Sequence, residues 1–301
     1  MTAAGDVRAG EPLRVTVLGT GVMGLGMARS LLRAGLAVTV WNRNGVKAAP
    51  LGSEGARVAA DLDSALEGAD VVVTMLFDAD TVADVVSDPI TAGRWPSGAV
   101  WVQATTTGLE GTARLASLAA DHDVPFVDAP VLGSKQPAQD GALTVLCSGP
   151  SSLRPRIEPV LEAVGSATVW VGEQAGQASG LKLVCNAWVT TLTDATAQSV
   201  ALAEGLGLDP RLFLQAISHG GTNNAYVQHK GKLMVERSTA TPAFSTSGAR
   251  KDVGLIRQAM LGCGVDTRLT DAVLTHFDAA HDAGYAEHDT AAVIHAFRPP
   301  G

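Results

Sequence analysis

The 301-residue chain is 46% hydrophobic and 17% charged, as expected of a globular protein long enough for two domains. Its formal net charge of −8 is offset by no long basic run, which argues against a nucleic acid or an anionic membrane as partner. Residues 1–12 lack the apolar core of a signal peptide and are expected to form a disordered tail.

The histidines show no metal-binding spacing, and the cysteines form no metal or redox motif. No metal is therefore expected, and the cysteines are expected to be buried free thiols in the cytoplasm: Cys147, Cys185 and Cys263.

A strand–turn–helix–strand pattern opens the first predicted domain, residues 13–173. A β-branched run at 13–18 leads into the sequence GTGVMG at 19–24, which is followed by an apolar helical pattern and a second strand at 36–41. A glycine-rich sequence alone is often an ordinary turn. In this βαβ context it indicates a dinucleotide-binding loop.

Each glycine of this loop has an expected task. Gly19 would make the tight turn, Gly21 would leave room for the pyrophosphate, and Gly24 would let the helix and strand pack closely. The pyrophosphate would then lie at the positive end of the helix dipole. The other predicted contacts of the loop are Thr20, Val22 and Met23.

The residues after the second strand favour one cofactor. Asn42 and Arg43 stand where an NAD enzyme usually has a carboxylate for the ribose, and Lys47 is nearby. A guanidinium can bind a 2′-phosphate with two hydrogen bonds, so NADPH is predicted over NADH. The alternative is that Arg43 only stacks on the adenine.

Further strands are expected at 69–76 and 99–102, and the pattern predicts a doubly wound, Rossmann-type α/β sheet of about eight strands. Leu76, at the end of the first of these strands, is predicted to contact the cofactor. The second strand ends in a run of threonine hydroxyls, where open parallel sheets bind ligands, and Thr106 is the predicted nicotinamide contact. A threonine that only caps the turn is the alternative.

Residues 128–141, DAPVLGSKQPAQDG, join two predicted strands. Gly133 and Ser134 would leave backbone N–H groups free to hold an anion such as a carboxylate. The alternative is an ordinary surface turn. With Leu132, these residues form the predicted substrate-binding segment.

Strand patterns end after Gly172, and an all-helical second domain is predicted from 174 to 301, entered by a long interdomain helix from about Gly176 to Glu204. Lys182 and Asn186 lie four residues apart on it and therefore share a face. A lysine on so apolar a helix would be partly desolvated, which lowers its pKa and makes it a proton donor and acceptor near neutral pH. The alternative is a lysine that extends to solvent from the helix edge. A cleft between the domains is the expected place for Lys182.

Further helices are predicted near 225–235, 248–261, 267–282 and 290–297. Within them, Lys251 and Asp252 are either an exposed ion pair, the usual meaning of such a dyad, or a pair that reaches into the expected cleft between the domains.

These separated motifs resemble those of the β-hydroxyacid dehydrogenases, which include 3-hydroxyisobutyrate dehydrogenase and the glyoxylate/succinic semialdehyde reductases. The resemblance runs from about Val15 to Ile294. It implies that Lys182 is the catalytic lysine, that Asn186 supports it, and that Lys251 contacts the cofactor near the nicotinamide. It also implies a homodimer or homotetramer whose helical domains pair.

Two positions depart from that pattern. Leu132 stands where the family usually has the first serine of its substrate loop, and Gln103 stands where it often has aspartate. The N-terminal half equally resembles the imine reductases, which share the fold and usually have Asp or Tyr at the position of Lys182. Their neutral or cationic imine substrates would suit Leu132.

The predicted function is NADPH-dependent reduction of a small carbonyl compound, an aldehyde or a keto acid. The nicotinamide would supply the hydride and Lys182 the proton. Two alternatives stay open: an NADPH-dependent imine reductase on the same scaffold, and a catalytically idle NADP-binding dimer that recruits other proteins.

Overall fold

The computed structural model describes residues 11–298, so the expected tail, residues 1–12, lies outside the described residues except for its last two. By its internal contacts the chain divides into two compact units, one ending at Lys182 and the other beginning at Leu183. The division falls inside one continuous helix, α8 (Gln177–Gly205). The predicted domain limits at residues 173 and 174 lie just before this helix and stay a prediction.

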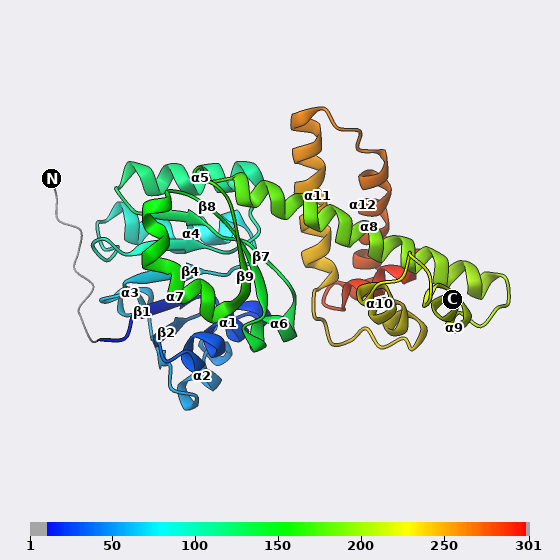
Figure 1. The fold of residues 1–301 in the computed structure, drawn as a ribbon, viewed down its shortest axis with the longest axis horizontal. Helices are drawn as coiled ribbons and strands as arrows, with labels where there is room; N and C mark the ends of the chain where they lie inside the picture. Colours follow the sequence, from blue (N-terminus) through cyan, green and yellow to red (C-terminus); the bar gives the residue numbers. More distant parts are fainter. Residues whose placement is uncertain (1–10, 299–301) are drawn as a thin grey trace. The chain divides into compact units, whose positions relative to one another are not determined.

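A nine-stranded sheet forms the centre of the first unit (Figure 1). Its strand order is β3-β2-β1-β4-β5-β6-β8-β7, with β9 also paired to β8. All neighbours from β3 to β6 are parallel, whereas β8 runs antiparallel to β6 and β7. The strands are β1 (Arg14–Leu18), β2 (Ala37–Trp41), β3 (Arg57–Val58), β4 (Val71–Thr74), β5 (Val100–Gln103), β6 (Phe126–Asp128), β7 (Val131–Leu132), β8 (Leu143–Ser148) and β9 (Gly165–Gly172).

Helices cover both faces of this sheet (Figure 1). One face packs against α1, α2, α6 and α7, and the other against α3, α4 and α5. The helices are α1 (Val22–Arg33), α2 (Ala49–Ser53), α3 (Leu62–Leu66), α4 (Ala79–Thr91), α5 (Gly108–Asp121), α6 (Lys135–Asp140) and α7 (Arg154–Val164), and the 3₁₀ turns are η1 (Gly45–Lys47) and η2 (Ser151–Leu153). The predicted doubly wound fold is confirmed.

Strand side chains alternate between two apolar cores, because successive residues of a strand point to opposite faces. Val100 and Val102 belong to one core, and Trp101 between them belongs to the other. The strands read as continuous apolar runs because both faces of a parallel sheet are buried.

Residues 128–141 are more ordered than a simple connection. They include the two-residue strand β7, which pairs with β8, and the six-residue helix α6. Neither was predicted, since so short a strand is specified by its distant partner rather than by its own sequence.

The second unit is helical, and its helices pack around the C-terminal part of α8. They are α9 (Arg211–Ile217), α10 (Ala225–Val235), α11 (Thr246–Cys263), α12 (Arg268–Ala280), the π turn η3 (His281–Tyr285) and the 3₁₀ helix η4 (Thr290–Ala296). Ser245 caps α11 by accepting a hydrogen bond from the Gly248 N–H, and Gly264 ends that helix in the left-handed conformation. The predicted helices at 225–235 and 248–261 are therefore confirmed, whereas the predicted helix at 290–297 is a 3₁₀ helix.

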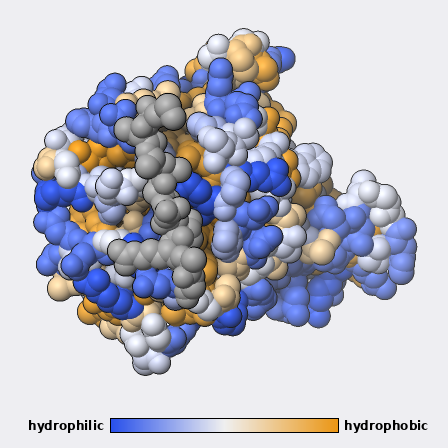
Figure 2. Space-filling view, turned by 60° about the vertical axis from the view of Figure 1, so that its left-hand side comes forward, coloured by the Kyte–Doolittle hydropathy of each residue, from blue (hydrophilic) through white to orange (hydrophobic). Residues whose placement is uncertain are grey.

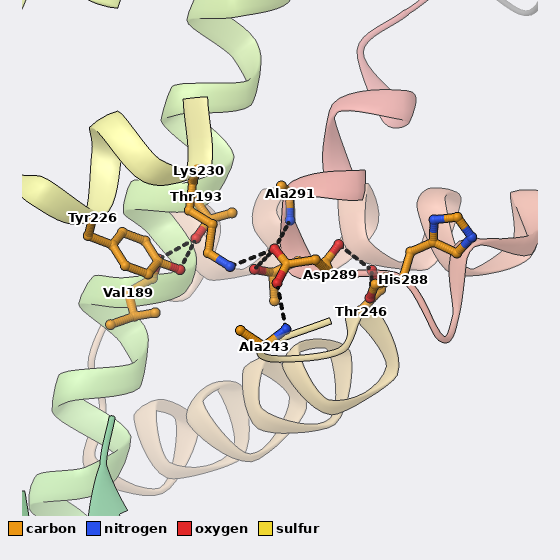
Figure 3. Close-up of polar contacts among 10 residues, drawn as sticks. Val189, Thr193, Tyr226, Lys230, Ala243, Thr246, His288, Asp289 and Ala291 are labelled. Atoms are coloured by element: carbon orange, nitrogen blue, oxygen red, sulfur yellow. Dashed lines mark hydrogen bonds and ion pairs between the residues drawn. The ribbon is translucent and has the colours of Figure 1, made fainter. Parts of the chain in front are cut away.

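A buried ion pair joins α10 to η4 (Figure 3). Lys230 Nζ lies 2.5 Å from Asp289 Oδ1, and the two side chains are 4% and 1% exposed. The carboxylate also accepts hydrogen bonds from the backbone N–H groups of Ala243 and Ala291, both at 3.0 Å. These donors compensate the buried negative charge, as a dry interior requires.

On the face drawn in Figure 2, hydrophilic residues surround scattered hydrophobic areas. Among the described residues, no helix is both long and apolar enough to cross a membrane.

Candidate active site

Two glycines of the loop after β1 are required by close backbone contacts. Gly19 has φ of +104°, and a Cβ there would lie 2.3 Å from the Met75 carbonyl oxygen. A Cβ on Gly24 would lie 2.0 Å from the Gly19 carbonyl oxygen. At Gly21, by contrast, a Cβ would meet no atom within 4 Å. The loop thus packs tightly on two sides and is open at Gly21.

The open side of the loop has the donors that a phosphate needs. Gly21 precedes α1, and no side chain caps the N–H groups of that helix's first turn, which begins at Val22 and Met23. The buried Thr20 Oγ1 has no hydrogen-bond partner within residues 11–298. A buried hydroxyl without a partner and an uncapped helix N-terminus fit a bound pyrophosphate.

Asn42 orders the turn that follows β2. Its Oδ1 accepts a hydrogen bond from the Thr20 N–H at 3.2 Å, and its Nδ2 donates to the Asn44 carbonyl at 2.9 Å. This turn carries the exposed Arg43, for which the described part of the chain has no ion-pair partner. The site beside the loop therefore has a guanidinium and no carboxylate at the end of β2.

The threonines after β5 differ in where their hydroxyls lie. Thr105 Oγ1 accepts a hydrogen bond from the Leu76 N–H at 2.9 Å, and Thr107 Oγ1 lies 2.8 Å from Thr112 Oγ1. Both residues are buried, whereas Thr106 between them is half-buried. Of the three, Thr106 is the one that a ligand could reach, and its role as a nicotinamide contact stays a prediction.

The predicted substrate segment is shaped by a sharp turn. Leu132 is half-buried and pairs with Thr144 of β8, and Gly133 follows with φ of +127°. A Cβ on Gly133 would lie 2.7 Å from Leu143 Cδ2. Ser134 precedes α6, a six-residue helix that is too short to have a strong helix dipole. Anion binding at Gly133 and Ser134 stays a prediction.

Lys182 lies on α8, half-buried, and its Nζ donates a hydrogen bond to the Val131 carbonyl at 2.8 Å. The Lys182 amine and the backbone beside Leu132 are thus brought together within the first unit.

Sequence reasoning missed Asp128, whose carboxylate accepts hydrogen bonds from the backbone N–H groups of Gly176 and Ser179 at the start of α8. The only signal was its position at the end of an apolar strand, β6.

In the second unit Asn186 is buried, and its Nδ2 donates to Asp252 Oδ2 at 2.6 Å. Asp252 Oδ1 lies 2.8 Å from Lys251 Nζ, although not in hydrogen-bonding geometry, and these side chains are only 5% and 19% exposed. The exposed-pair interpretation of Lys251 and Asp252 is therefore wrong. Sequence reasoning also missed that Asp252 is the partner that orients Asn186.

Within residues 11–298, no group of three His, Cys, Asp or Glu side chains is arranged to hold a metal ion. The expectation that all cysteines are buried is wrong. Cys147 is buried, and burial raises the pKa of its thiol to about 12. Cys185 is half-buried, and Cys263 is exposed because it is the last residue of α11.

Two protein families match almost the whole described chain. Residues 14–172 match the family described as the NAD binding domain of 6-phosphogluconate dehydrogenase. Residues 176–297 match the family described as NAD-binding of NADP-dependent 3-hydroxyisobutyrate dehydrogenase.

Individual relatives agree with these families. The chain is 30% identical to glyoxylate/succinic semialdehyde reductase 2 of Arabidopsis thaliana, over 93% of this chain and 78% of that protein. The crystal structure of 3-hydroxyisobutyrate dehydrogenase from Salmonella typhimurium superposes with a TM-score of 0.86 at 27% identity, covering 94% of this chain and 99% of that one. An imine reductase from Pseudomonas sp. superposes with a TM-score of 0.65 at 25% identity, covering 96% of this chain and all of that one.

Proposed function

The chain belongs to the β-hydroxyacid dehydrogenase family and is an NAD(P)-dependent oxidoreductase that acts on hydroxyl and carbonyl groups. From this premise we propose that it is an NADPH-dependent reductase of a small aldehyde or keto acid. The observation that carries the proposal is the hydrogen bond from Lys182 Nζ to the Val131 carbonyl. It holds an ammonium beside the segment of Leu132, Gly133 and Ser134, where the substrate is proposed to bind.

Lys182 is the proposed acid. NADPH, when bound, would supply the hydride that reduces the carbonyl carbon. Lys182 as ammonium would give a proton to the carbonyl oxygen, and the neutral amine left behind would regain a proton from water. Asn186, oriented by Asp252, is proposed to orient the substrate hydroxyl.

The cofactor is proposed to be NADPH. Gly19, Thr20, Gly21, Val22, Met23 and Gly24 would hold the pyrophosphate, Leu76, Thr106 and Lys251 the nicotinamide end, and Asn42 and Arg43 the 2′-phosphate. Support for the phosphate comes from the exposed Arg43 and from the absence of a carboxylate directly after β2.

A second candidate, imine reduction, is favoured by Leu132. An apolar side chain in the substrate segment offers no hydroxyl to a substrate carboxylate, and it suits a neutral or cationic imine. Lys182 favours the carbonyl substrate instead, because an ammonium stabilises a developing alkoxide.

We also propose that the chain forms a homodimer or homotetramer through α8. Val184, Trp188 and Leu202 on this helix are 67%, 66% and 61% exposed. Between Leu183 and Thr193 the helix has no charged residue, as is typical of permanent interfaces.

Oxidation of NADPH by the purified protein tests the proposal, with glyoxylate, succinic semialdehyde, neutral aldehydes and cyclic imines as substrates. Turnover of the aldehyde acids is the expected result. Turnover of imines alone would replace the carbonyl assignment with the second candidate. Tight NADPH binding with no turnover on any of these compounds would instead favour an idle binding protein.

A further inference from the structure

Asp128, the last residue of β6, is a buried carboxylate without a lysine or arginine partner within residues 11–298. It is fully buried, and all its hydrogen bonds come from serine hydroxyls and backbone N–H groups. Its Oδ2 accepts from the Gly176 N–H at 3.0 Å, the Ser179 N–H at 2.9 Å and the Ser148 hydroxyl at 3.3 Å. Its Oδ1 accepts from the Ser179 hydroxyl at 2.8 Å. Four donors therefore hold the carboxylate in one place.

These donors belong mainly to the first turn of α8. An α-helix leaves the N–H groups of its first turn without partners in the helix, and a negative charge there is favoured by the helix dipole. The Ala178 N–H donates to the Ser148 hydroxyl at 3.0 Å, and that hydroxyl in turn donates to Asp128. The N-terminus of α8 is thus already occupied by a carboxylate of the chain itself, and a substrate carboxylate has no free donor there.

The same two segments meet at a second point three residues further along each. Ser179 contacts Asp128, and Lys182, one helical turn later, donates through Nζ to Val131 at 2.8 Å. Residues 128–131 and 179–182 are therefore joined at both ends. The first contact fixes the start of α8 against the sheet, and the second fixes the position of the Lys182 amine.

We propose that Asp128 is the positioning residue for Lys182. By binding the first turn of α8, its carboxylate sets the rotation and height of that helix against β6, and so holds the Lys182 amine beside Val131. Asp128 does not touch the reacting atoms in this assignment and acts only through the helix. The inference rests on the proposed function, because it takes Lys182 to be the proton donor.

Asp128→Asn tests this with little change of shape. An amide can point its one acceptor oxygen at the Gly176 and Ser179 N–H groups, and its NH₂ group can donate to the Ser179 hydroxyl. The negative charge that strengthens these bonds and complements the helix dipole is lost, so the first turn of α8 is held less firmly. A displacement of a catalytic group by about 1 Å can reduce turnover on the order of 100-fold. We therefore expect kcat to fall by about 10- to 100-fold with little change in KM or in NADPH affinity.

A second readout needs no substrate. The rate at which an amine-reactive reagent labels Lys182, measured by mass spectrometry of the whole folded protein, is expected to rise severalfold in Asp128→Asn, while the rate at Lys47 stays the same. Asp61→Ala is the matched control, since Asp61 caps α3 through the Ser64 N–H at 2.8 Å and has no contact with α8. It removes a helix cap in the same unit and is expected to change neither Lys182 labelling nor kcat.

An Asp128→Asn variant that folds and keeps both the labelling rate and kcat overturns the inference. If that variant does not fold, Ser179→Ala takes its place, because it removes one donor and leaves the charge. A smaller change in the same direction is expected there, and no change in either readout contradicts the inference. If the wild-type protein reduces nothing on the substrate panel, the proposed function fails, and the labelling rate alone decides the role of Asp128.

Discussion

Lys182 is the residue on which the proposed chemistry depends most directly. Its replacement by alanine removes the proton donor and leaves the loop at residues 19–24 unchanged. General-acid catalysis contributes roughly 100- to 10,000-fold, so Lys182→Ala is expected to lose turnover by that factor while binding NADPH normally. Steady-state kinetics and a cofactor fluorescence titration would measure the two effects. Lys232→Ala, which changes an exposed lysine of α10, is the control, and wild-type turnover in Lys182→Ala would reject the assignment.

Arg43 is the residue proposed to distinguish NADPH from NADH. Without its guanidinium, the 2′-phosphate of NADPH loses charge-assisted hydrogen bonds worth about 1.5–3 kcal/mol, while NADH has no such group to lose. Arg43→Ala is therefore expected to reduce the affinity for NADPH about 10- to 100-fold more than that for NADH. Dissociation constants for both cofactors provide the measurement. An equal loss for both would indicate that Arg43 stacks on the adenine instead.

Gly21 and Gly24 have different tasks in the proposed cofactor loop, residues 19–24. A Cβ at position 24 would meet the Gly19 carbonyl at 2.0 Å, so Gly24→Ala is expected to cost about 1–3 kcal/mol of folding free energy. A Cβ at position 21 meets nothing within 4 Å, so Gly21→Ala is expected to fold normally and to bind NADPH more weakly. Urea unfolding and cofactor titration of both variants would separate packing from binding. Normal NADPH affinity in Gly21→Ala would mean that the pyrophosphate does not approach this glycine.

The ion pair between α10 and η4 gives the helical unit a pH-dependent stability. Burial acts to raise the pKa of Asp289, but Lys230 and the backbone donors outweigh it, and the pKa is lowered below its usual range. The stabilisation is therefore complete above the unfolded-state pKa of about 3.9 and is lost as the pH falls through the lower folded value. Asp289→Asn leaves the Lys230 ammonium buried alone and is expected to cost about 3–5 kcal/mol at neutral pH.

Urea unfolding of the wild type and of Asp289→Asn as a function of pH would test this. The difference in unfolding free energy is expected to shrink below about pH 4. Asp266→Asn changes an exposed aspartate that pairs with Arg268, and it should alter stability little at any pH. A constant difference between wild type and Asp289→Asn across the pH range would contradict the assigned role.

Local elements were predictable from the sequence, and distant pairings were not. The strand, glycine loop and helix at residues 13–34 follow from hydrophobic periodicity and glycine spacing within one short segment. Strand β7 depends on β8, and three of the four donors to Asp128 come from Gly176 and Ser179, about fifty residues away at the start of α8. The orientation of Asn186 likewise depends on Asp252 of another helix. Periodicity does not contain such contacts, so these residues of the site could be found only in three dimensions.

At the scale of the whole molecule, α8 is the proposed contact between copies of the chain. A charge at the centre of an apolar interface is costly, so Trp188→Glu is expected to shift the protein to a monomer. Light scattering after size-exclusion chromatography measures the mass directly. Leu269→Glu changes a side chain of α12 that is 64% exposed and serves as the control. A wild-type protein that is already monomeric would reject the proposed assembly.

The continuous α8 also restricts how such proteins can be recombined. The division between the two compact units falls within this helix, between Lys182 and Leu183. A chimera joined at that point would draw the proposed acid from one parent and Asn186, one turn later, from the other. A crossover placed before Gly176 would instead separate Asp128 from the turn of α8 that it binds. A crossover that takes Lys182 and Asn186 from one parent has to lie outside residues 182–186. Lys182 and Asn186 would then both come from the same parent sequence.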